Sequence, residues 1–280
     1  MEKLFALIGH PLGHSLSPYM HNGAFKHLDI NAFYSRIDIC DEEFDQACGA
    51  MKTLNYKGFN VTIPYKERII DHLDYIDPMA RVIGAVNTVV NRAGQWHGYN
   101  TDCIGFLRTL DEAGINLEGK NVCILGHGGA ARAVAYGCLK AGASRMDVFT
   151  RDKMRVDDWY WKLAQDYKHV QICLYQDMND SEAYDLVVNT TPVGMHPDTG
   201  LSVVDTCKIG YEKTVFYDLI YNPFVTRFLE GAKESGRQTI NGLDMLIYQG
   251  IEALDIWIDE IDIIKKWTRQ DVLNEIRHLL

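Results

Sequence analysis

The sequence has no excess of positive charge, no closely paired cysteines and no long apolar run. Its formal net charge is −10 over 280 residues, which disfavours a nucleic-acid backbone or an anionic membrane surface as a partner. None of the seven cysteines forms a Cys-x-x-Cys pair, and the odd number fits no closed set of disulfides. Reduced thiols and a cytoplasmic location are therefore expected.

Targeting, repeat and metal signals are also missing. The first apolar run ends at Gly9 and Pro11, too short for a signal-peptide core or a membrane span, and it predicts a first strand. The sequence contains no internal repeat and no low-complexity tract. His10 and His14 are four apart, but the intervening proline and glycine disfavour the helix that a metal pair would need. No metal is expected. The net charge does not exclude a small anionic substrate, because a local site can oppose it.

Short β-like runs alternate with amphipathic stretches of helical length, the pattern of an α/β protein with mainly parallel sheets. In the first hundred residues we expect strands at Leu4–Gly9, Ala32–Asp38, Gly58–Thr62 and Asn87–Asn91. Helices are expected at Ser17–Leu28, Asp41–Leu54 and Pro64–His72. The segment 89–100 predicts a hairpin that turns at Ala93 and Gly94.

A second unit is expected after a polar junction at 116–120. Its strands are predicted at 121–125, 146–150, 171–174, 185–189 and 214–218, with a helix at Gly129–Gly142. The chain is predicted to be helical from Leu243 onward. We expect a substrate-binding α/β domain at 1–102, completed by C-terminal helices at about 243–280 that return to it, and a Rossmann-type dinucleotide-binding domain at 103–242.

A glycine-rich turn, GHGGAA at 126–131, directly follows the expected strand 121–125. It fits G-x-G-x-x-G/A, the pattern that binds the pyrophosphate of a dinucleotide. Gly126 permits the tight turn, Gly128 lets the backbone approach the pyrophosphate, and the small Ala131 lets the helix pack on the strand. The helix N-terminus offers its N–H groups and its positive dipole end to the phosphates.

The next strand of this unit bears on the choice of dinucleotide. NAD sites carry an acid at its end for the ribose 2′-hydroxyl, whereas an arginine accommodates the 2′-phosphate of NADP. Here the strand ends at Thr150 without an acid. Arg151, Lys153 and Arg155 follow, which favours NADP. Asp152 among these cations leaves NAD possible, and a solvated basic helix start is the other interpretation.

Lys66 and Asp102 are candidates for proton transfer. Pro64 suits the first position of a helix, which places Lys66 in the first helical turn. There the positive end of the dipole disfavours the charged ammonium, a useful setting for a lysine that exchanges a proton. Asp102, beside the expected domain boundary, could stabilise this ammonium or could only cap the following helix. Dipole and carboxylate would act on Lys66 in opposite directions, and the sequence leaves their balance open.

Two serines follow the first strand in a loop. Ser17 could cap the helix that starts at Pro18. Ser15 has no such local role, so its hydroxyl is a candidate ligand.

Taken together, these motifs resemble the shikimate dehydrogenase family, including its quinate/shikimate branch. The resemblance runs over nearly the whole chain. It is carried by HSLSP at 14–18, NVTIPYK at 60–66, GAVNT at 84–88, NTD at 100–102, GHGGAA at 126–131, YNP at 221–223 and NGLDMLIYQG at 241–250. The resemblance implies reversible, NADPH-dependent reduction of 3-dehydroshikimate to shikimate in aromatic amino-acid biosynthesis, by a monomer or homodimer.

The resemblance also implies roles for individual residues. It makes Lys66 the general acid/base and Asp102 its partner. The substrate's carboxylate and ring hydroxyls would be held by Ser15, Ser17, Thr62, Asn87, Asp102, Tyr221 and Gln249. The cofactor would meet Gly126, His127, Gly128, Gly129 and Ala130 at the pyrophosphate, Thr150, Arg151 and Arg155 at the 2′-phosphate, and Leu219 and Gly242 at the nicotinamide.

Four positions depart from the family pattern. Cys103 and Asp244 stand where glycine is usual, which bears on local backbone geometry. Thr150 and Asp152 replace the usual residues beside the first arginine, which bears on cofactor choice. Two alternatives stay open: a quinate/shikimate dehydrogenase that uses NAD or NADP, and a dinucleotide-sensing protein without catalysis. The presence of both Lys66 and Asp102 argues against the second.

Overall fold

The computed structural model describes residues 2–13, 15–179, 183–259 and 263–279. The chain forms two compact units, one of Met1–Gly105 with Leu246–Leu280 and one of Phe106–Met245. The two changes from one unit to the other lie within helices α4 (Asp102–Glu112) and α8 (Leu243–Trp257). The sequence-based boundaries at 102 and 243 are three residues away from each change.

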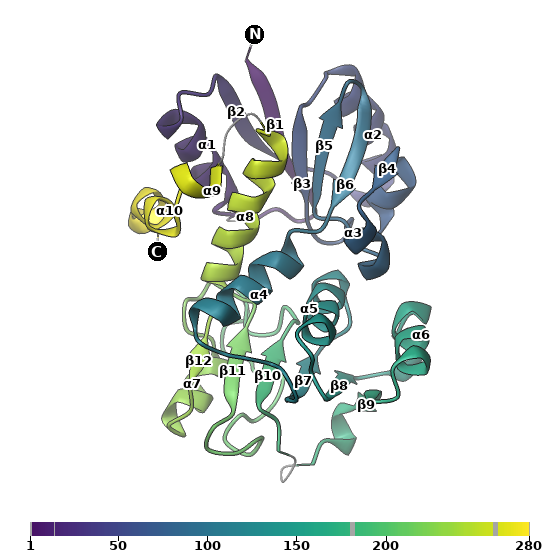
Figure 1. The fold of residues 1–280 in the computed structure, drawn as a ribbon, viewed down its shortest axis with the longest axis vertical. Helices are drawn as coiled ribbons and strands as arrows, with labels where there is room; N and C mark the ends of the chain where they lie inside the picture. The colour runs from purple at the N-terminus through teal and green to yellow at the C-terminus, as the bar shows by residue number, and fades with distance from the viewer. Residues whose placement is uncertain (1, 14, 180–182, 260–262, 280) are drawn as a thin grey trace. The chain divides into compact units, whose positions relative to one another are not determined.

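The first unit contains a six-stranded sheet of order β2-β1-β3-β5-β6-β4 (Figure 1). Its strands are β1 (Lys3–Gly9), β2 (Ala32–Asp38), β3 (Gly58–Val61), β4 (Tyr75–Ile76), β5 (Thr88–Arg92) and β6 (Gln95–Tyr99). Its remaining helices are α1 (Ser17–His27), α2 (Phe44–Thr53), α3 (Pro78–Ile83), α9 (Ile263–Lys266) and α10 (Arg269–Ile276). β1 pairs in parallel with β2 and β3, whereas β5 is antiparallel to β3 and β6.

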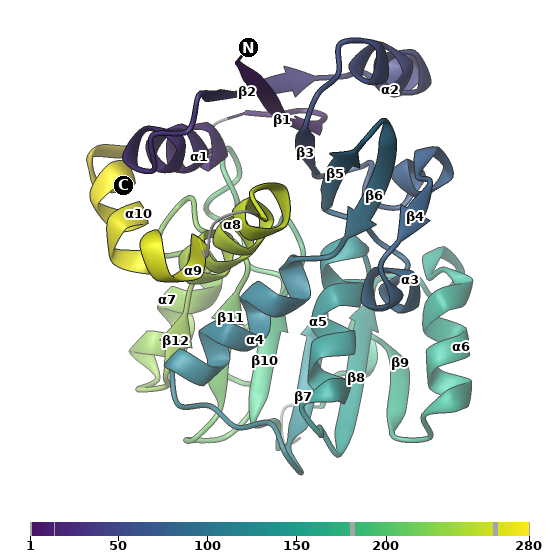
Figure 2. The same ribbon diagram turned by 45° about the horizontal axis from the view of Figure 1, so that its top comes forward.

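Helices cover both faces of this sheet. Alternate residues of β1 point to opposite faces, and apolar residues on each face pack against a helix. Phe5 contacts Phe25 of α1 and Trp257 of α8, with ring centroids 5.1 and 5.0 Å apart. Ala6 and Ile8 belong to a different core cluster that includes three residues of α2. Figure 2 shows α10 beside α1. The expected return of the C-terminal helices to the first unit is confirmed.

Two local predictions have opposite outcomes. The hairpin between β5 and β6 is confirmed, with Ala93 and Gly94 at φ of 54° and 91°, the left-handed pair that a tight two-residue turn requires. The helix predicted over Pro64–His72 is wrong. Residues 63–67 form turns, and only a short 3₁₀ helix, Arg68–His72, follows them. The proline pattern indicated a helix start, but the chain turns there, with a hydrogen bond of 2.9 Å from Tyr65 N to Thr62 O.

The second unit has a six-stranded sheet of order β12-β11-β10-β7-β8-β9, in which every pair is parallel. Its strands are β7 (Asn121–Leu125), β8 (Arg145–Thr150), β9 (Val170–Leu174), β10 (Leu186–Asn189), β11 (Val215–Asp218) and β12 (Thr239–Ile240). Its helices are α5 (Gly129–Lys140), α6 (Asp158–Asp166) and α7 (Arg227–Glu234). Numbered within the unit, this is the order 3-2-1-4-5-6 of a Rossmann fold.

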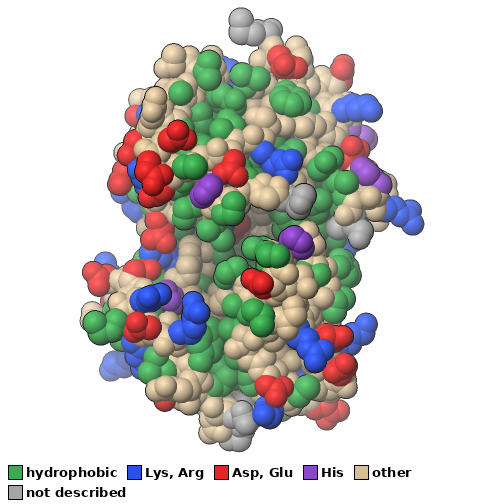
Figure 3. Space-filling model, turned by 180° about the vertical axis from the view of Figure 1, so that it is seen from behind, with side chains coloured by type: hydrophobic (Ala, Val, Ile, Leu, Met, Phe, Trp, Pro, Cys, Tyr) green, Lys and Arg blue, Asp and Glu red, His purple; other side chains and the backbone are tan. Residues whose placement is uncertain are grey.

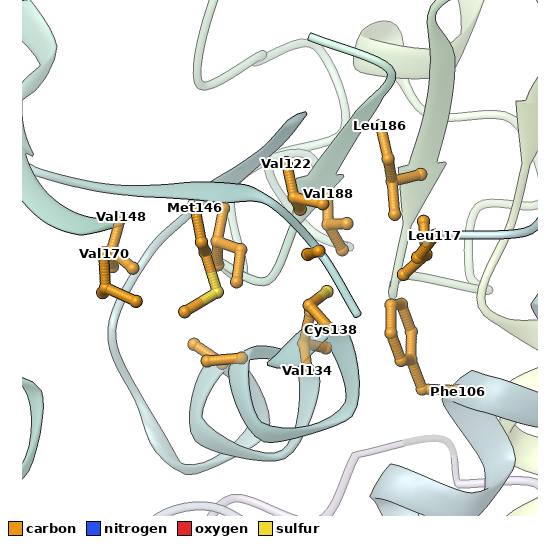
Figure 4. Packing of buried hydrophobic residues seen from close by; sticks show 14 of the residues in the cluster. Phe106, Leu117, Val122, Val134, Cys138, Met146, Val148, Val170, Leu186 and Val188 are labelled. Carbon is orange, nitrogen blue, oxygen red and sulfur yellow. The ribbon is translucent and has the colours of Figure 1, made fainter. Parts of the chain in front are cut away.

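Strand β7 lies at the centre of this unit and is buried on both faces. Val122 and Ile124 pack with Val134 and Cys138 of α5 in one cluster (Figure 4). Cys123 and Leu125 point the other way, into a second cluster. A strand buried on both sides reads as a continuous apolar run, which is why the segment 121–125 could be recognised in the sequence.

Two further observations concern the surface charge and the hydrophobicity of the helices. On the face drawn in Figure 3, acidic and basic side chains are interspersed instead of being segregated by sign. Within the described ranges, no helix is both long enough and apolar enough to cross a membrane.

Candidate functional site

In the first unit, polar side chains gather where β3 and β6 end and β5 begins. Asn60 on β3 lies opposite Thr88 on β5, and Thr88 lies opposite Tyr99 at the end of β6. Because β5 runs antiparallel to both neighbours, its first residues meet the last residues of β3 and β6. The segment that follows β6 therefore brings Asp102 to the same edge.

Lys66 and Asp102 form a close ion pair at this edge. Lys66 Nζ is 2.6 Å from Asp102 Oδ2, and the two side chains are only 14% and 9% exposed. A backbone hydrogen bond of 2.7 Å from Val86 N to Lys66 O holds the turn that carries the lysine. Because Lys66 is in a turn, the argument from a helix dipole does not apply to it. The charged group in contact with the Lys66 ammonium is the Asp102 carboxylate.

Asn87 holds the other oxygen of this carboxylate. Its Nδ2 donates to Asp102 Oδ1 at 2.9 Å and lies 3.4 Å from Gln249 Oε1. Its Oδ1 accepts a 2.8 Å hydrogen bond from Thr101 N. Asn87 is 3% exposed and Gln249 is 8% exposed. A backbone donor on one side and a carboxylate on the other fix the amide orientation.

Two residues of this edge, Asn60 and Thr101, were missed as site residues. Asn60 Nδ2 donates to Thr88 Oγ1 at 3.1 Å, and Thr101 Oγ1 accepts from Asn87 Nδ2 at 3.0 Å. Both are buried. Each stands in a motif, NVTIPYK or NTD, that had been singled out for other members, so their place in these motifs was the available signal.

The serine loop differs from its sequence-based interpretation. Helix α1 begins at Ser17 itself, and its N-cap residue is Leu16, without a side-chain cap. Ser17 therefore does not cap the helix. Ser15 does have a local role, because its Oγ accepts from Ser17 N at 3.2 Å and donates to Ser17 Oγ at 3.2 Å. The two hydroxyls lie together as a pair, whereas His14 before them is outside the described residues.

The remaining predicted substrate residues are distributed over both units. Thr62 directly follows β3 and is half-buried. Its backbone N–H donates to Ile8 O at 2.9 Å, which places it at the end of β1 as well. Tyr221 belongs to the second unit, in the segment after β11.

The glycine turn of the second unit has the geometry of a phosphate-binding loop. Gly126 has φ of +107°, and a Cβ there would lie 2.7 Å from Thr190 Oγ1. An added Cβ at Gly128 would meet nothing within 4 Å, so the backbone there is open to a ligand. Gly128 is the N-cap of α5, and the buried Ala131 packs this helix on the sheet. The turn and α5 lie at the carboxyl end of β7, beside β10, where a Rossmann sheet reverses its strand order and binds ligands.

Basic side chains follow β8, as the sequence indicates. Thr150 is 2% exposed, and its Oγ1 accepts from Asp152 N at 3.2 Å. Asp152 in turn caps the following 3₁₀ segment through a 2.9 Å hydrogen bond from Met154 N. Arg151 and Arg155 lie at this turn, and Arg155 Nε is 3.9 Å from Asp152 Oδ2. Asp152 therefore has a structural role that its charge alone did not reveal.

Leu219 and Gly242 lie against each other. A Cβ at Gly242 would collide with the carbonyl oxygen of Leu219, and Gly242 N donates to Ile220 O at 3.0 Å. Glycine is required there for close contact between two backbone segments. This gives Gly242 a structural role beside its predicted place near the nicotinamide.

A buried carboxylate, Asp218, organises the segments around Leu219 and was not predicted. It accepts from Asn189 Nδ2 at 3.0 Å, from Ile220 N at 3.1 Å and from Thr226 Oγ1 at 2.5 Å. Burial raises the pKa of Asp218 to about 6, although these three donors lower it in part. An acid at the last position of a buried strand was the signal in the sequence.

The family departures at Cys103 and Asp244 fit regular helices. Cys103 is 1% exposed in α4, and its N–H donates to Asn100 Oδ1 at 3.2 Å. Asp244 lies in the first turn of α8, where the helix dipole stabilises a negative charge. Neither position requires glycine.

The parallel 3-2-1-4-5-6 sheet with its glycine turn, and the buried ammonium–carboxylate pair in the other unit, are the features of a two-domain, dinucleotide-dependent dehydrogenase. Residues 7–89 match the family model described as the shikimate dehydrogenase substrate binding domain. Shikimate dehydrogenase (NADP(+)) from Carboxydothermus hydrogenoformans is 45% identical over 91% of each chain. The enzyme of the same name from Bacillus cereus is 40% identical over 93% of this chain and 94% of its own.

A solved structure extends the comparison to three dimensions. Shikimate 5-dehydrogenase from Thermus thermophilus, in complex with NADP(H) and shikimate, is 34% identical to this chain. The match covers 99% of this chain and 100% of that one with a TM-score of 0.84. The chain belongs to the shikimate dehydrogenase family.

Proposed function

We propose that the protein is an NADP-dependent shikimate dehydrogenase, which reversibly reduces 3-dehydroshikimate to shikimate in chorismate and aromatic amino-acid biosynthesis. The observation that carries the proposal is the buried Lys66–Asp102 pair at 2.6 Å, with the other carboxylate oxygen held by Asn87. Relatives that are 40–45% identical over most of the chain carry this activity in their names.

Lys66 is the general acid of the proposed reduction. Its ammonium donates a proton to the carbonyl oxygen of the substrate, and in the reverse direction the neutral amine accepts the proton of the hydroxyl. Asp102 compensates the ammonium charge, and Asn87 fixes the carboxylate so that one oxygen faces Lys66. Removing either member of the pair would leave the other charge buried without compensation.

The second unit fits a dinucleotide. Gly126 and Gly128 leave the backbone open toward the N-terminus of α5, where phosphates bind. NADPH, when bound, supplies the hydride that reduces the ring carbonyl carbon. Arg151 and Arg155, which follow Thr150 at the end of β8, would bind the 2′-phosphate. His127, Gly129 and Ala130 would line the pyrophosphate, and Leu219 with Gly242 would adjoin the nicotinamide.

Neutral polar side chains are suited to a polyhydroxylated ring. Ser15, Ser17 and Tyr221 would meet the substrate carboxylate, while Thr62 and Gln249 would join Asn87 and Asp102 at the ring hydroxyls. A buried group built to bind a hydroxyl loses its partner when the ligand lacks that hydroxyl, so discrimination between ring acids should be steep. A cytoplasmic monomer or homodimer completes the proposal.

A kinetic matrix tests the function against its alternatives. We expect kcat/KM for shikimate with NADP+ to exceed every other combination of shikimate or quinate with NAD+ or NADP+ by about tenfold or more. Equal turnover of quinate with NAD+ would instead favour a quinate/shikimate dehydrogenase. Tight NADP+ binding without turnover of either acid would favour a sensing protein.

A further inference from the structure

Tyr34, a residue of β2, is buried behind the candidate substrate site. It is 1% exposed, and its phenol donates a 2.8 Å hydrogen bond to Asn60 Oδ1. Asn60 Nδ2 donates to Asn87 O at 3.2 Å and to Thr88 Oγ1 at 3.1 Å. The amide of Asn60 therefore uses both of its ends, with its oxygen toward Tyr34 and its nitrogen toward β5.

The hydrogen bonds continue from there in one direction to the ion pair. Thr88 Oγ1, which accepts from Asn60, donates to Asn87 Oδ1 at 3.1 Å. Asn87 Nδ2 then donates to Asp102 Oδ1 at 2.9 Å, and Asp102 Oδ2 accepts from Lys66 at 2.6 Å. The nitrogen of the Asn60 amide is directed to Asn87 O and Thr88, so its oxygen is left as the acceptor that the Tyr34 phenol satisfies at the start of this series.

Helix α1 fixes the position of Tyr34. Asn22 donates to Tyr34 O at 2.9 Å and accepts from Tyr34 N at 2.8 Å. The His21 ring stacks on the Tyr34 ring with centroids 4.5 Å apart, and burial lowers the pKa of His21 to about 3, so this ring is neutral. Burial also raises the pKa of the Tyr34 phenol well above its usual range, and a hydrogen bond with Ser17 lowers it in part. The phenol therefore stays protonated and remains the donor to Asn60 Oδ1.

We propose that Tyr34 is a positioning residue for the proposed reaction, supporting through Asn60 the edge that carries Asn87, Asp102 and Lys66. The inference rests on the proposed function, since it assigns Tyr34 an effect on shikimate turnover. Phenylalanine at this position would keep the ring against His21 and remove only the phenolic oxygen. A buried amide oxygen that loses its donor shifts to find another, and the groups bound to Asn60 would move with it.

The test is Tyr34→Phe, assayed with shikimate and NADP+. We expect kcat/KM for shikimate to fall about tenfold, while KM for NADP+ stays within about twofold, because only substrate and proton-transfer groups are displaced. Tyr184→Phe is the matched control. Tyr184 is equally buried, in the second unit, and its phenol donates to Asp147 at 2.7 Å. It should lower the melting temperature as Tyr34→Phe does and leave kcat/KM unchanged.

Variants of Thr88 test the same series without touching Tyr34. Thr88→Val removes the hydroxyl and should reduce kcat/KM for shikimate as Tyr34→Phe does, whereas Thr88→Ser keeps it and should restore most of the activity. In the double variant Tyr34→Phe/Thr88→Val, the loss should be smaller than the product of the two single losses, because both interrupt one series. The Thr88 pair also provides the test if Tyr34→Phe does not fold.

The outcomes separate the inference from the function on which it rests. Wild-type kcat/KM in Tyr34→Phe, equal activity of Thr88→Val and the wild type, or fully multiplicative losses would overturn the role of Tyr34 and leave the proposed function in place. A wild-type protein that does not turn over shikimate would overturn both.

Discussion

The two units hold their candidate site residues by different means. In the first unit, side chains hold one another through hydrogen bonds between residues far apart in the sequence, such as Asn87 and Gln249, which are 162 residues apart. In the second unit, the candidate phosphate site is a backbone turn at Gly126 and Gly128 before a helix N-terminus. A site made of interlocking side chains should lose its chemistry when one member changes. A site made of backbone should lose affinity for its ligand when a glycine of the turn is replaced by a residue with a side chain.

The units also differ in how their buried titratable groups respond to pH. His21 in the first unit has its pKa lowered to about 3 by burial. Asp218 in the second unit has its pKa raised to about 6 by burial. Burial disfavours the charged form in both cases, but a base becomes charged in acid and an acid becomes charged in base. The contributions of His21 and Asp218 to stability should therefore change with pH in opposite directions.

The largest effect should follow from Lys66→Ala, which removes the proposed acid. We expect kcat to fall by about 10²- to 10⁴-fold, while binding of shikimate and NADP+ stays within a few-fold. Stopped-flow turnover and equilibrium titration measure the two quantities separately. Lys57→Ala is the control, since Lys57 Nζ donates to Asn55 Oδ1 at 3.2 Å in an exposed turn outside the site. Near-wild-type kcat in Lys66→Ala would refute the proton-transfer role.

The next effect concerns His21 and the stability of the first unit. Its usual pKa of 6.5 applies to the unfolded chain, so its contribution to stability is complete above pH 6.5 and is lost as the pH falls toward 3. Between pH 6.5 and 4 this amounts to about 3 kcal/mol. His21→Phe keeps a ring beside Tyr34 and cannot take up the proton. Chemical denaturation across this range should show a smaller loss of stability in the variant, and an identical slope would contradict the prediction.

Asp218 should act in the opposite direction on the second unit. Its unfolded pKa is 3.8, so its contribution to stability is complete below pH 3.8 and is lost as the pH rises through 6. The expected change is about 3 kcal/mol at most, and the pKa of about 6 from which it follows already includes the three donors bonded to Asp218. Asp218→Asn should remove this pH dependence in denaturation experiments between pH 4 and 7. A variant that follows the wild-type curve would show that another group titrates.

A smaller effect distinguishes the two glycines of the turn. Gly126→Ala places a Cβ at a positive φ and 2.7 Å from Thr190 Oγ1, which should cost about 1–2 kcal/mol of folding stability and weaken NADP+ binding. Gly128→Ala meets nothing within 4 Å, so it should leave the melting temperature unchanged and weaken NADP+ binding alone. Thermal melts with and without NADP+ measure both. Equal destabilisation by the two variants would contradict the comparison.

The contrast between local backbone geometry and long-range side-chain contacts also explains what could be predicted from the sequence. The glycine turn, the hairpin at Ala93–Gly94 and the Rossmann strands are local patterns, because backbone geometry there is fixed by neighbouring residues. The helix over Pro64–His72 was wrong because proline is compatible with both a helix start and a turn. Local motifs pointed to Asn60 and Thr101, and the strand-end acid pointed to Asp218, but their contacts with Thr88, Asn87 and Asn189 depend on which strand ends meet, and no local pattern encodes that.

The smallest effect concerns Arg151 and the choice between NADP and NAD in the second unit. Arg151 is an exposed cation directly after β8, so Arg151→Ala should disturb neither the fold nor the first unit. It should raise KM for NADP+ about tenfold and leave KM for NAD+ nearly unchanged, because an arginine that pairs with a 2′-phosphate has no partner in NAD. Lys168→Ala, a change of another exposed cation of the same unit, should affect neither cofactor. Equal losses for both dinucleotides would show that Arg151 is a solvated residue, and the preference for NADP would then have to come from Arg155 or from Lys153 in the same turn.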